Sequence, residues 1–253
     1  RDVRKAKRKD HLRAVAKFTR DVNGHLQFVE NPPVLVHLTN TPQDMSDAAQ
    51  VISNYRDTLS DDVRSLFDRF TIVDIARRAV GVGSVGTSCW IALLEGPHHV
   101  GRDRVILQVK EATASVLEPY VGTSTLGHHG LRVVAGQRLT QSASDIFLGW
   151  TKGPRSGREF YVRQMWDAKG QGDLTRMDVN NLSYYGALCG WALARAHART
   201  GDPSAIAGYL GRSDTFDAAI TSFSEAYAET NERDYQRFLA AIDSGRIEAV
   251  HGV

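Results

Sequence analysis

The stretch AVGVGSVGTSCWIALL, residues 79–94, sets the fold class, because its glycines are spaced G-x-G-x-x-G and an apolar run follows them directly. A dinucleotide-binding Rossmann loop has this spacing, but it requires a helix that begins inside the motif. Here Cys89, Ile91 and Leu93 share one face of an extended chain, which predicts a strand. A Walker loop is excluded, since the chain has no Gly-Lys-Ser or Gly-Lys-Thr.

A third kind of glycine loop is the hairpin that covers the phosphates of ATP in protein kinases. That hairpin requires a lysine on the following strand, directed at the phosphates. The run RVILQVKEA, residues 104–112, supplies Lys110. An edge lysine that reaches solvent is the alternative interpretation. The residues predicted to hold the phosphates are Gly81, Gly83, Ser84, Gly86 and Lys110.

The pattern around this loop predicts an α+β fold. Strands are expected at residues 71–80, 89–96 and 104–112, as an antiparallel sheet. A helix of four to five turns is expected next, because apolar residues recur every four positions from Leu131 to Phe147. The run REFYVRQMW then alternates as a half-buried strand does. The remainder is predicted to be helical, with one apolar stripe that includes Cys189.

We therefore expect a kinase-like arrangement of two lobes, a small antiparallel sheet with one long helix followed by a mainly helical lobe. The predicted divisions are a basic N-terminal arm with a helical connector, residues 1–70, a nucleotide lobe, residues 71–168, and a partial helical lobe, residues 169–253. In the connector, Thr41 is expected to cap a helix that begins at Pro42.

The other residues of a kinase site match this sequence less well than the glycine loop and the lysine do. An acidic residue is expected on the helix after the lysine, but that region offers only Gln137 near Ala135. The segment between the lobes would read adenine, and it contains Gln164, Met165 and Trp166. The nearest match to a catalytic loop is HARTGD, with Asp202 as the candidate base. A polar turn at the end of a helix is the alternative for Asp202.

Composition and charge limit the partners. Residues 1–20 hold nine Lys or Arg against two Asp. Because few aromatic residues lie among them for stacking on bases, we expect a solvated helix or connector, with no nucleic acid partner. No apolar window approaches the about 18 residues of a membrane span, so we predict a cytoplasmic protein.

The candidate metal ligands are few. Cys89 and Cys189 are expected to be buried, reduced thiols. The adjacent histidine pairs, residues 98–99 and 128–129, lack the spacing of metal ligands. We predict no metal site from the residues of this chain, so any magnesium that accompanies ATP would be bound by groups outside it. The Trp residues are expected to be core anchors.

Longer runs carry a family resemblance. VDIARRAVGVGSVGT, LQVKEATASVLEPY, GQRLTQSASDIFLGWT, FYVRQMWDAKG, ALCGWALARAHARTGD and IAGYLG closely resemble the uncharacterised bacterial family called domain of unknown function 2252. Its members look like distant relatives of protein kinases and aminoglycoside phosphotransferases. Their Gly-Asp-x-His-x-x-Asn and Asp-rich motifs precede the glycine loop, as if the kinase order were permuted. Those motifs are absent here, and the family's usual Glu is replaced by Ala135.

The resemblance implies that this chain is the C-terminal part of such a protein. The predicted function is an ATP-binding, kinase-like phosphotransferase with magnesium as cofactor, an unknown phosphate acceptor and a catalytic loop outside this chain. A noncatalytic regulatory or interaction module that keeps the fold is the second hypothesis. A Rossmann oxidoreductase is the third, and it requires residues 87–95 to be helical.

Overall fold

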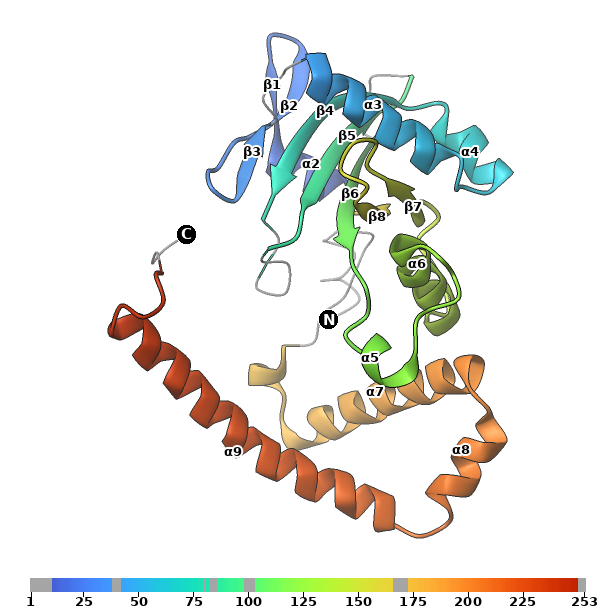
Figure 1. The fold of residues 1–253 in the computed structure, drawn as a ribbon, viewed down its shortest axis with the longest axis vertical. Coiled ribbons are helices and arrows are strands. Elements are labelled where there is room, and N and C mark those ends of the chain that lie inside the picture. Colours follow the sequence, from blue (N-terminus) through green and yellow to red (C-terminus); the bar gives the residue numbers. More distant parts are fainter. Residues whose placement is uncertain are drawn as a thin grey trace. The chain divides into compact units, whose positions relative to one another are not determined.

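A computed structural model describes residues 11–37, 42–79, 81, 86–97, 103–165 and 173–249. At its centre is a six-stranded antiparallel sheet with the order β3-β4-β5-β6-β8-β7 (Figure 1). The strands are β3 (Leu35–His37), β4 (Thr71–Arg78), β5 (Cys89–Glu95), β6 (Arg104–Ala112), β7 (Gly149–Lys152) and β8 (Glu159–Gln164). The α+β class predicted from the sequence is confirmed.

The three strands expected around the glycine turn are all present, and each pairs with the next along the chain. β4 and β5 form the hairpin that encloses the turn, and β6 follows as the third strand. Because the residues after Gly86 form a strand and not a helix, the Rossmann hypothesis is wrong. The alternation of Cys89, Ile91 and Leu93 was the signal that excluded it.

The two faces of the sheet have separate cores. We call the face that carries Ile91, Ile106 and Lys110 the inner face, and the opposite one, with Ala92 and Leu107, the outer face. Antiparallel pairing places directly opposite residues on the same face, so these assignments follow from the register. Buried side chains of β5 and β6 contribute to both cores, which is why the run CWIALL is almost entirely apolar.

Helices α3 (Pro42–Arg56) and α4 (Asp61–Phe67) cover the outer face (Figure 1). The start of α3 at Pro42 is confirmed, while its predicted cap, Thr41, lies outside the described residues. Tyr55 is fully buried, donates a hydrogen bond of 2.6 Å to the carbonyl of Phe147, and packs edge-on against Phe67. These contacts make the predicted connector an integral part of the sheet body.

The N-terminal segment packs on the inner face. Helix α2 (His11–Phe18) is followed by a hairpin of β1 (Thr19–Val22) and β2 (His25–Phe28). Ala14 and Val15 are buried in the inner core with Ile106 and Met165. The prediction of a solvated arm is therefore wrong for α2. The prediction rested on the many charged residues of this segment, and the few apolar residues among them pack on the sheet.

The helix expected up to Phe147 is shorter than predicted. α6 (His129–Thr140) ends at Gln141, whose backbone is extended. The Asp145 carboxylate then accepts the backbone N–H groups of Phe147 and Gln164, which ties this segment to β8 and lets Phe147 enter the outer core. Strand β7, which the sequence analysis missed, follows directly. A short helix, α5 (Glu118–Val121), precedes α6.

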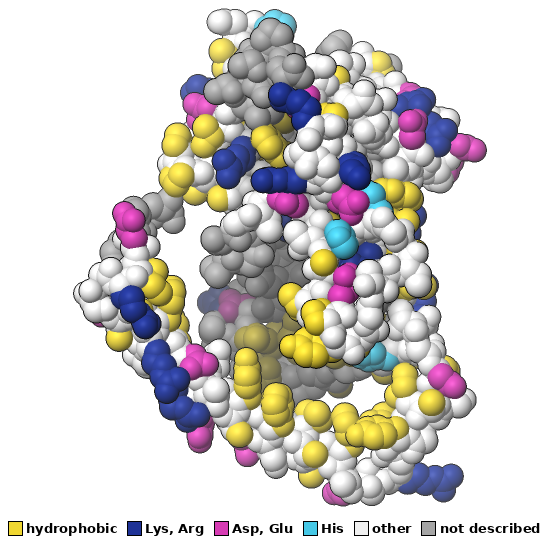
Figure 2. Space-filling view, viewed as in Figure 1, with side chains coloured by type: hydrophobic (Ala, Val, Ile, Leu, Met, Phe, Trp, Pro, Cys, Tyr) yellow, Lys and Arg dark blue, Asp and Glu magenta, His cyan; other side chains and the backbone are white. Residues whose placement is uncertain are grey.

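The helical half contains a 3₁₀ turn (Leu174–Arg176) and three helices, α7 (Val179–Thr200), α8 (Pro203–Leu210) and α9 (Thr215–Asp243). This half is helical, as predicted, but the apolar stripes of its helices are exposed, as Figure 2 shows. Trp191 is 62% and Phe223 is 63% exposed, so the prediction that Trp191 anchors a core is wrong. Cys189 is also exposed, contrary to prediction, because the stripe on which it lies has no cover in the described structure.

The chain divides into two compact units, Arg1–Ala196 and His197–Val253. This division falls within α7, whereas the sequence analysis placed boundaries at residues 70 and 168. The first unit includes α2, α3 and α4, which contact the sheet directly. Inside the second unit, Tyr209 packs edge-on against Phe216, and Phe223 stacks on Tyr227.

The first prediction concerns Gly130, where α6 approaches β8 most closely. A Cβ at Gly130 would lie 2.1 Å from the carbonyl oxygen of Phe160, so Gly130→Ala forces the helix away from the strand. We expect a loss of about 1–3 kcal/mol in the free energy of unfolding, measured in urea. Gly136→Ala on the same helix is the matched control, since nothing lies within 4 Å of its Cβ. It should stabilise by about 0.5–1 kcal/mol. Equal effects at both sites would contradict the packing.

The second prediction concerns His37, which joins β3 to β4. Its ring nitrogens lie 3.0 Å from Glu30 and 3.0 Å from Asp74. Burial lowers the pKa of His37, but the hydrogen bonds to Asp74 and Glu30 outweigh it, so the pKa is raised. The charged ring therefore stabilises the fold below the unfolded pKa of about 6.5, and this stabilisation is lost as pH rises through the raised folded value.

The test compares the melting temperature of the wild type with that of His37→Gln, which stays neutral. The gap between the two should be largest near pH 6 and should shrink by pH 9. Groups that titrate equally in both proteins cancel in the difference. A gap that is constant or that grows with pH would show that the imidazolium does not hold β3.

Candidate functional site

Two glycines of the turn between β4 and β5 are described, Gly81 and Gly86, and both have positive φ. Gly81 has φ 131° and Gly86 has φ 82°, in the region that residues with a Cβ rarely adopt. Among the described residues no atom lies within 4 Å of a Cβ built at either position, so the positive φ is the reason that the structure gives for glycine there. Gly83 and Ser84 lie outside the described residues.

The exit of the turn is fixed by Glu111. Its carboxylate accepts the backbone N–H of Ser88 at 2.8 Å, and its own backbone N–H donates to the carbonyl of Ser88 at 2.9 Å. Arg158 donates to the hydroxyl of Ser88 at 2.7 Å and lies 3.5 Å from the Glu111 carboxylate. The two hydrogen bonds between Glu111 and Ser88 therefore fix the start of β5. The side chain of Glu111 points away from the inner face.

Lys110 lies on the inner face, in the row of the sheet next to the glycine turn. In this row Cys89, the first residue of β5, pairs with Lys110 on β6, and Lys110 pairs with Tyr161 on β8. The ammonium lies 6.0 Å from the centre of the Tyr161 ring, within the range of a cation–π contact. Arg78 continues the row on β4, because its neighbour Arg77 pairs with Trp90. This places the predicted lysine beneath the exit of the glycine hairpin.

Positive charge gathers on the inner face. Arg78 and Arg163 each have a buried Nε atom without a hydrogen-bond partner within the described residues. The Arg78 guanidinium lies 4.6 Å from the centre of the Phe18 ring and 3.5 Å from the sulfur of Met165. Burial lowers the pKa of Arg78, although a guanidinium remains charged at neutral pH. Two buried N–H donors with no acceptor make this face a candidate anion site.

Two glutamates that follow Lys110 in the sequence, Glu111 and Glu118, have other contacts. Glu118 accepts the backbone N–H of Ser115 at 3.1 Å, and Glu111 clamps Ser88. Gln137 lies on the stripe of α6 that contains the buried Gly130 and Val134. No hydrogen bond joins the Gln137 side chain to Lys110 in the part of the chain that the structure describes. Among the described residues, Lys110 has the ring of Tyr161 as a neighbour and no carboxylate as a partner.

The predicted adenine-reading segment uses its backbone donors within the fold. The N–H of Gln164 donates to the Asp145 carboxylate, and the N–H of Met165 donates to the carbonyl of Ile106 at 2.8 Å. The side chain of Met165 is 1% exposed, in the inner core. Trp166 lies outside the described residues. Because these two N–H groups are already engaged, an adenine base bound here would contact the backbone carbonyl groups of this segment or residues that follow it.

Asp202 is the N-cap of α8. Its Oδ1 accepts the backbone N–H groups of Ser204 at 2.8 Å and Ala205 at 3.1 Å. Pro203 follows at the first helical position, a frequent start of a helix. The polar turn that was the alternative interpretation thus accounts for this carboxylate fully. Asp202 belongs to the second unit, Lys110 to the first.

Two general features of the described ranges bear on the site. They contain no group of three or more His, Cys, Asp or Glu side chains placed to hold a metal ion. His128 instead caps α6, where its Nδ1 accepts the N–H of Leu131 at 3.2 Å. Burial lowers the pKa of His128, which favours the neutral ring that this role requires. None of the helices described combines the length and apolar character that a membrane crossing requires.

Sequence reasoning missed Arg78, Tyr161 and Arg163, which lie on the same face of the sheet as Lys110. Alternate residues of a strand lie on the same face of the sheet, so the sequence shows which residues of one strand share a face. It shows which residues of other strands lie next to them only after the strand order and register are known. The order β6-β8 places Tyr161 beside Lys110 although 51 positions separate them in the sequence. No local pattern contains that information.

Comparison with known families places the chain among its relatives. The chain belongs to the family described as an uncharacterized protein conserved in bacteria (DUF2252), whose profile matches residues 1–241. The family predicted from the sequence is thus confirmed. No curated protein and no solved structure matches the chain.

The third prediction separates the two thiols. Cys89 is 2% exposed, and burial raises its pKa despite the opposing effect of Lys110 and Arg78. Because the thiolate is the reactive form, Cys89 should react with Ellman's reagent only after unfolding. Cys189 is exposed and should react at once, giving one fast thiol per chain. Cys189→Ser should remove the fast phase. Two fast thiols would show that the row beneath the glycine turn is open.

Proposed function

We propose that this chain forms the nucleotide-binding part of an ATP-dependent, kinase-like phosphotransferase. The observation that carries the proposal is the position of Lys110. It pairs with Cys89, the first residue of the strand that follows the glycine turn, and it lies on the inner face. In kinases a glycine-rich loop covers the phosphates, and the lysine that binds them lies on the third strand. Counted from the strand that enters the glycine turn, Lys110 also lies on the third strand.

The order of elements supports the same function. A helix follows the lysine strand, and two further strands return to the sheet so that β8 pairs with β6. The helix, α6, contacts β6, β7 and β8. In a kinase this helix supplies the glutamate that orients the lysine. Here Ala135 and Gln137 stand in that region, so Tyr161, and a hydrogen bond donated by the ammonium to the side-chain oxygen of Gln137, would position Lys110 without a carboxylate.

The charges on the inner face fit polyphosphate. Lys110 and the orphaned Nε atoms of Arg78 and Arg163 offer cationic donors to an anion. Gly81, Gly83 and Gly86, with the amide of Ser84, would cover the phosphates, and Gln164, Met165 and Trp166 would border the base. The described residues provide no cluster of carboxylates for magnesium, so no residue of this chain is assigned to it.

A noncatalytic nucleotide-binding module is the second candidate, and the contacts of Asp202 favour it. A catalytic base must accept a proton from the attacking hydroxyl. Asp202 already accepts two helix N–H groups through Oδ1, so this oxygen is engaged in capping α8 and is not free to accept that proton. The two candidates share ATP binding and differ in transfer, so release of labelled phosphate from ATP distinguishes them.

The fourth prediction tests nucleotide binding itself. At ATP and magnesium concentrations ten times the dissociation constant, linkage adds about 1.4 kcal/mol to the stability of the folded chain. The melting temperature should then rise by about 3–5 °C. Lys110→Ala should abolish this rise, because it removes the charge that binds the phosphates.

Lys152→Ala is the matched control, since Lys152 is an exposed lysine on β7 of the same sheet. It should leave the rise in melting temperature unchanged. Each variant is first melted without nucleotide, so that loss of folding is distinguished from loss of binding. An unchanged melting temperature of the wild type at millimolar ATP, or an equal rise in Lys110→Ala, would refute the proposal.

A further inference from the structure

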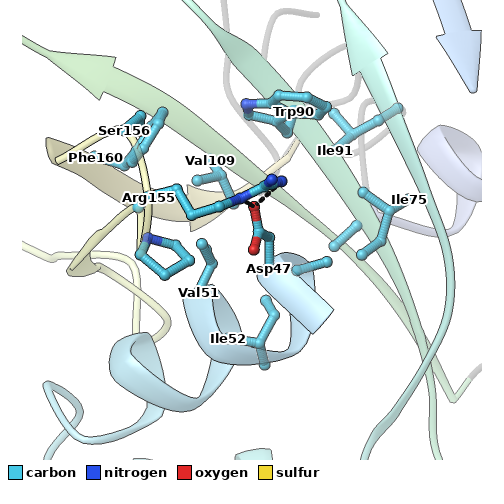
Figure 3. Close-up of a pocket in the computed structure, with 14 residues that line it drawn as sticks. Asp47, Val51, Ile52, Ile75, Trp90, Ile91, Val109, Arg155, Ser156 and Phe160 are labelled. Carbon is cyan, nitrogen blue, oxygen red and sulfur yellow. Dashed lines mark hydrogen bonds and ion pairs between the residues drawn. The ribbon is translucent and has the colours of Figure 1, made fainter. Parts of the chain in front are cut away.

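A hollow in the described structure lies on the outer face, away from Lys110. It has a volume of about 430 Å³ and lies between α3, the face of β4, β5 and β6, and the turn that joins β7 to β8 (Figure 3). Its walls are formed mainly by apolar side chains, among them Val51, Ile52, Ile75, Trp90, Val109 and Phe160. This pocket is separated from the candidate nucleotide site by the thickness of the sheet.

Water in a pocket with apolar walls is unfavourable, because the free energy falls when apolar surface leaves water. The volume equals that of about fourteen liquid waters, at about 30 Å³ each. Those waters would find few hydrogen-bond partners among apolar walls, and Ile52, Ile75 and Trp90 remain only partly buried. An apolar molecule would bury this surface and displace poorly bonded water.

One ion pair crosses the pocket. Arg155, in the β7–β8 turn, donates from Nε and Nη2 to Oδ2 of Asp47 on α3, each at 2.6 Å. Figure 3 shows the two side chains meeting in the middle of the apolar residues. The two residues lie 108 positions apart in the sequence, so the ion pair connects two walls of the pocket that come from distant segments of the chain. Because the charges neutralise each other, the pocket favours a neutral occupant.

We propose that this pocket is a binding site for a neutral aromatic or aliphatic small molecule, and that the Asp47–Arg155 ion pair closes over it. The volume, about 430 Å³, falls within the range of about 300–1,000 Å³ that small-molecule pockets have. The walls give affinity through apolar contact, and the ion pair must open for the ligand to enter or leave. The inference depends on the outer face alone and holds whether or not the chain binds ATP.

The fifth prediction uses N-phenyl-1-naphthylamine, a neutral aromatic dye that fluoresces when it leaves water. Trp90 lines the pocket and can transfer energy to bound dye; because the chain has four Trp residues, the variants below assign the signal to the pocket. The wild type should show saturable transfer. Ala48→Phe, which places a ring in the pocket, should weaken dye binding at least tenfold and should keep or raise the melting temperature, since it fills a void.

Ala49→Phe is the matched control, the same substitution one residue further along α3, at an exposed position. It should bind the dye as the wild type does. If the dye binds Ala48→Phe as tightly as Ala49→Phe, it is bound elsewhere, for example by the exposed helices, and the proposal is wrong. Should Ala48→Phe fail to fold, Ile75→Phe fills the opposite wall and is judged by the same comparison.

The role of the ion pair has its own readout. Arg155→Gln removes one partner, so bound dye should dissociate several-fold faster in a stopped-flow dilution than from the wild type. Arg158→Gln, in the same turn but absent from the pocket walls, should not change that rate. Equal dissociation rates in wild type and Arg155→Gln would show that the pair does not close the pocket.

Discussion

The pairing of β5 with β6, which sets Cys89 opposite Lys110, is the contact on which both faces of the sheet depend. A slip of one residue would turn every side chain of β6 to the opposite face. Lys110 would then enter the outer core, and Val109 would leave it. The double contact between Glu111 and Ser88 opposes such a slip, because it fixes this register at the end of the ladder nearest the glycine turn.

The same register explains why cations accumulate where they do. Arg78, Lys110 and Arg163 lie on the inner face, on which α2 packs. Like charges repel one another, and two of these side chains also have a buried Nε without a partner among the described residues. Each arrangement costs stability unless an anion is bound. Phosphates would relieve both costs at once, which is why electrostatics and glycine geometry support the same ligand.

Local periodicity was enough to predict the hairpin, the lysine strand and the helices, since each is a continuous run with its own pattern. Periodicity failed where contacts between distant segments determine the structure. Phe147 continued a four-residue repeat, yet Asp145 draws its segment out of α6 and onto β8. Ala14 and Val15 lie among charged residues but pack on the sheet. Of the candidate site, Lys110 was predicted, while Arg78, Tyr161 and Arg163 required the strand order.

Alternation along a strand also links the two proposed sites. Trp90 and Val109 line the outer pocket, and they adjoin Cys89 and Lys110, which face inward. A strand cannot shift on one face and remain fixed on the other, because both sets of side chains are attached to one backbone. A molecule that fills the outer pocket therefore holds the same backbone that carries Lys110. The sheet thus offers a short physical connection between an apolar ligand on one side and anion binding on the other.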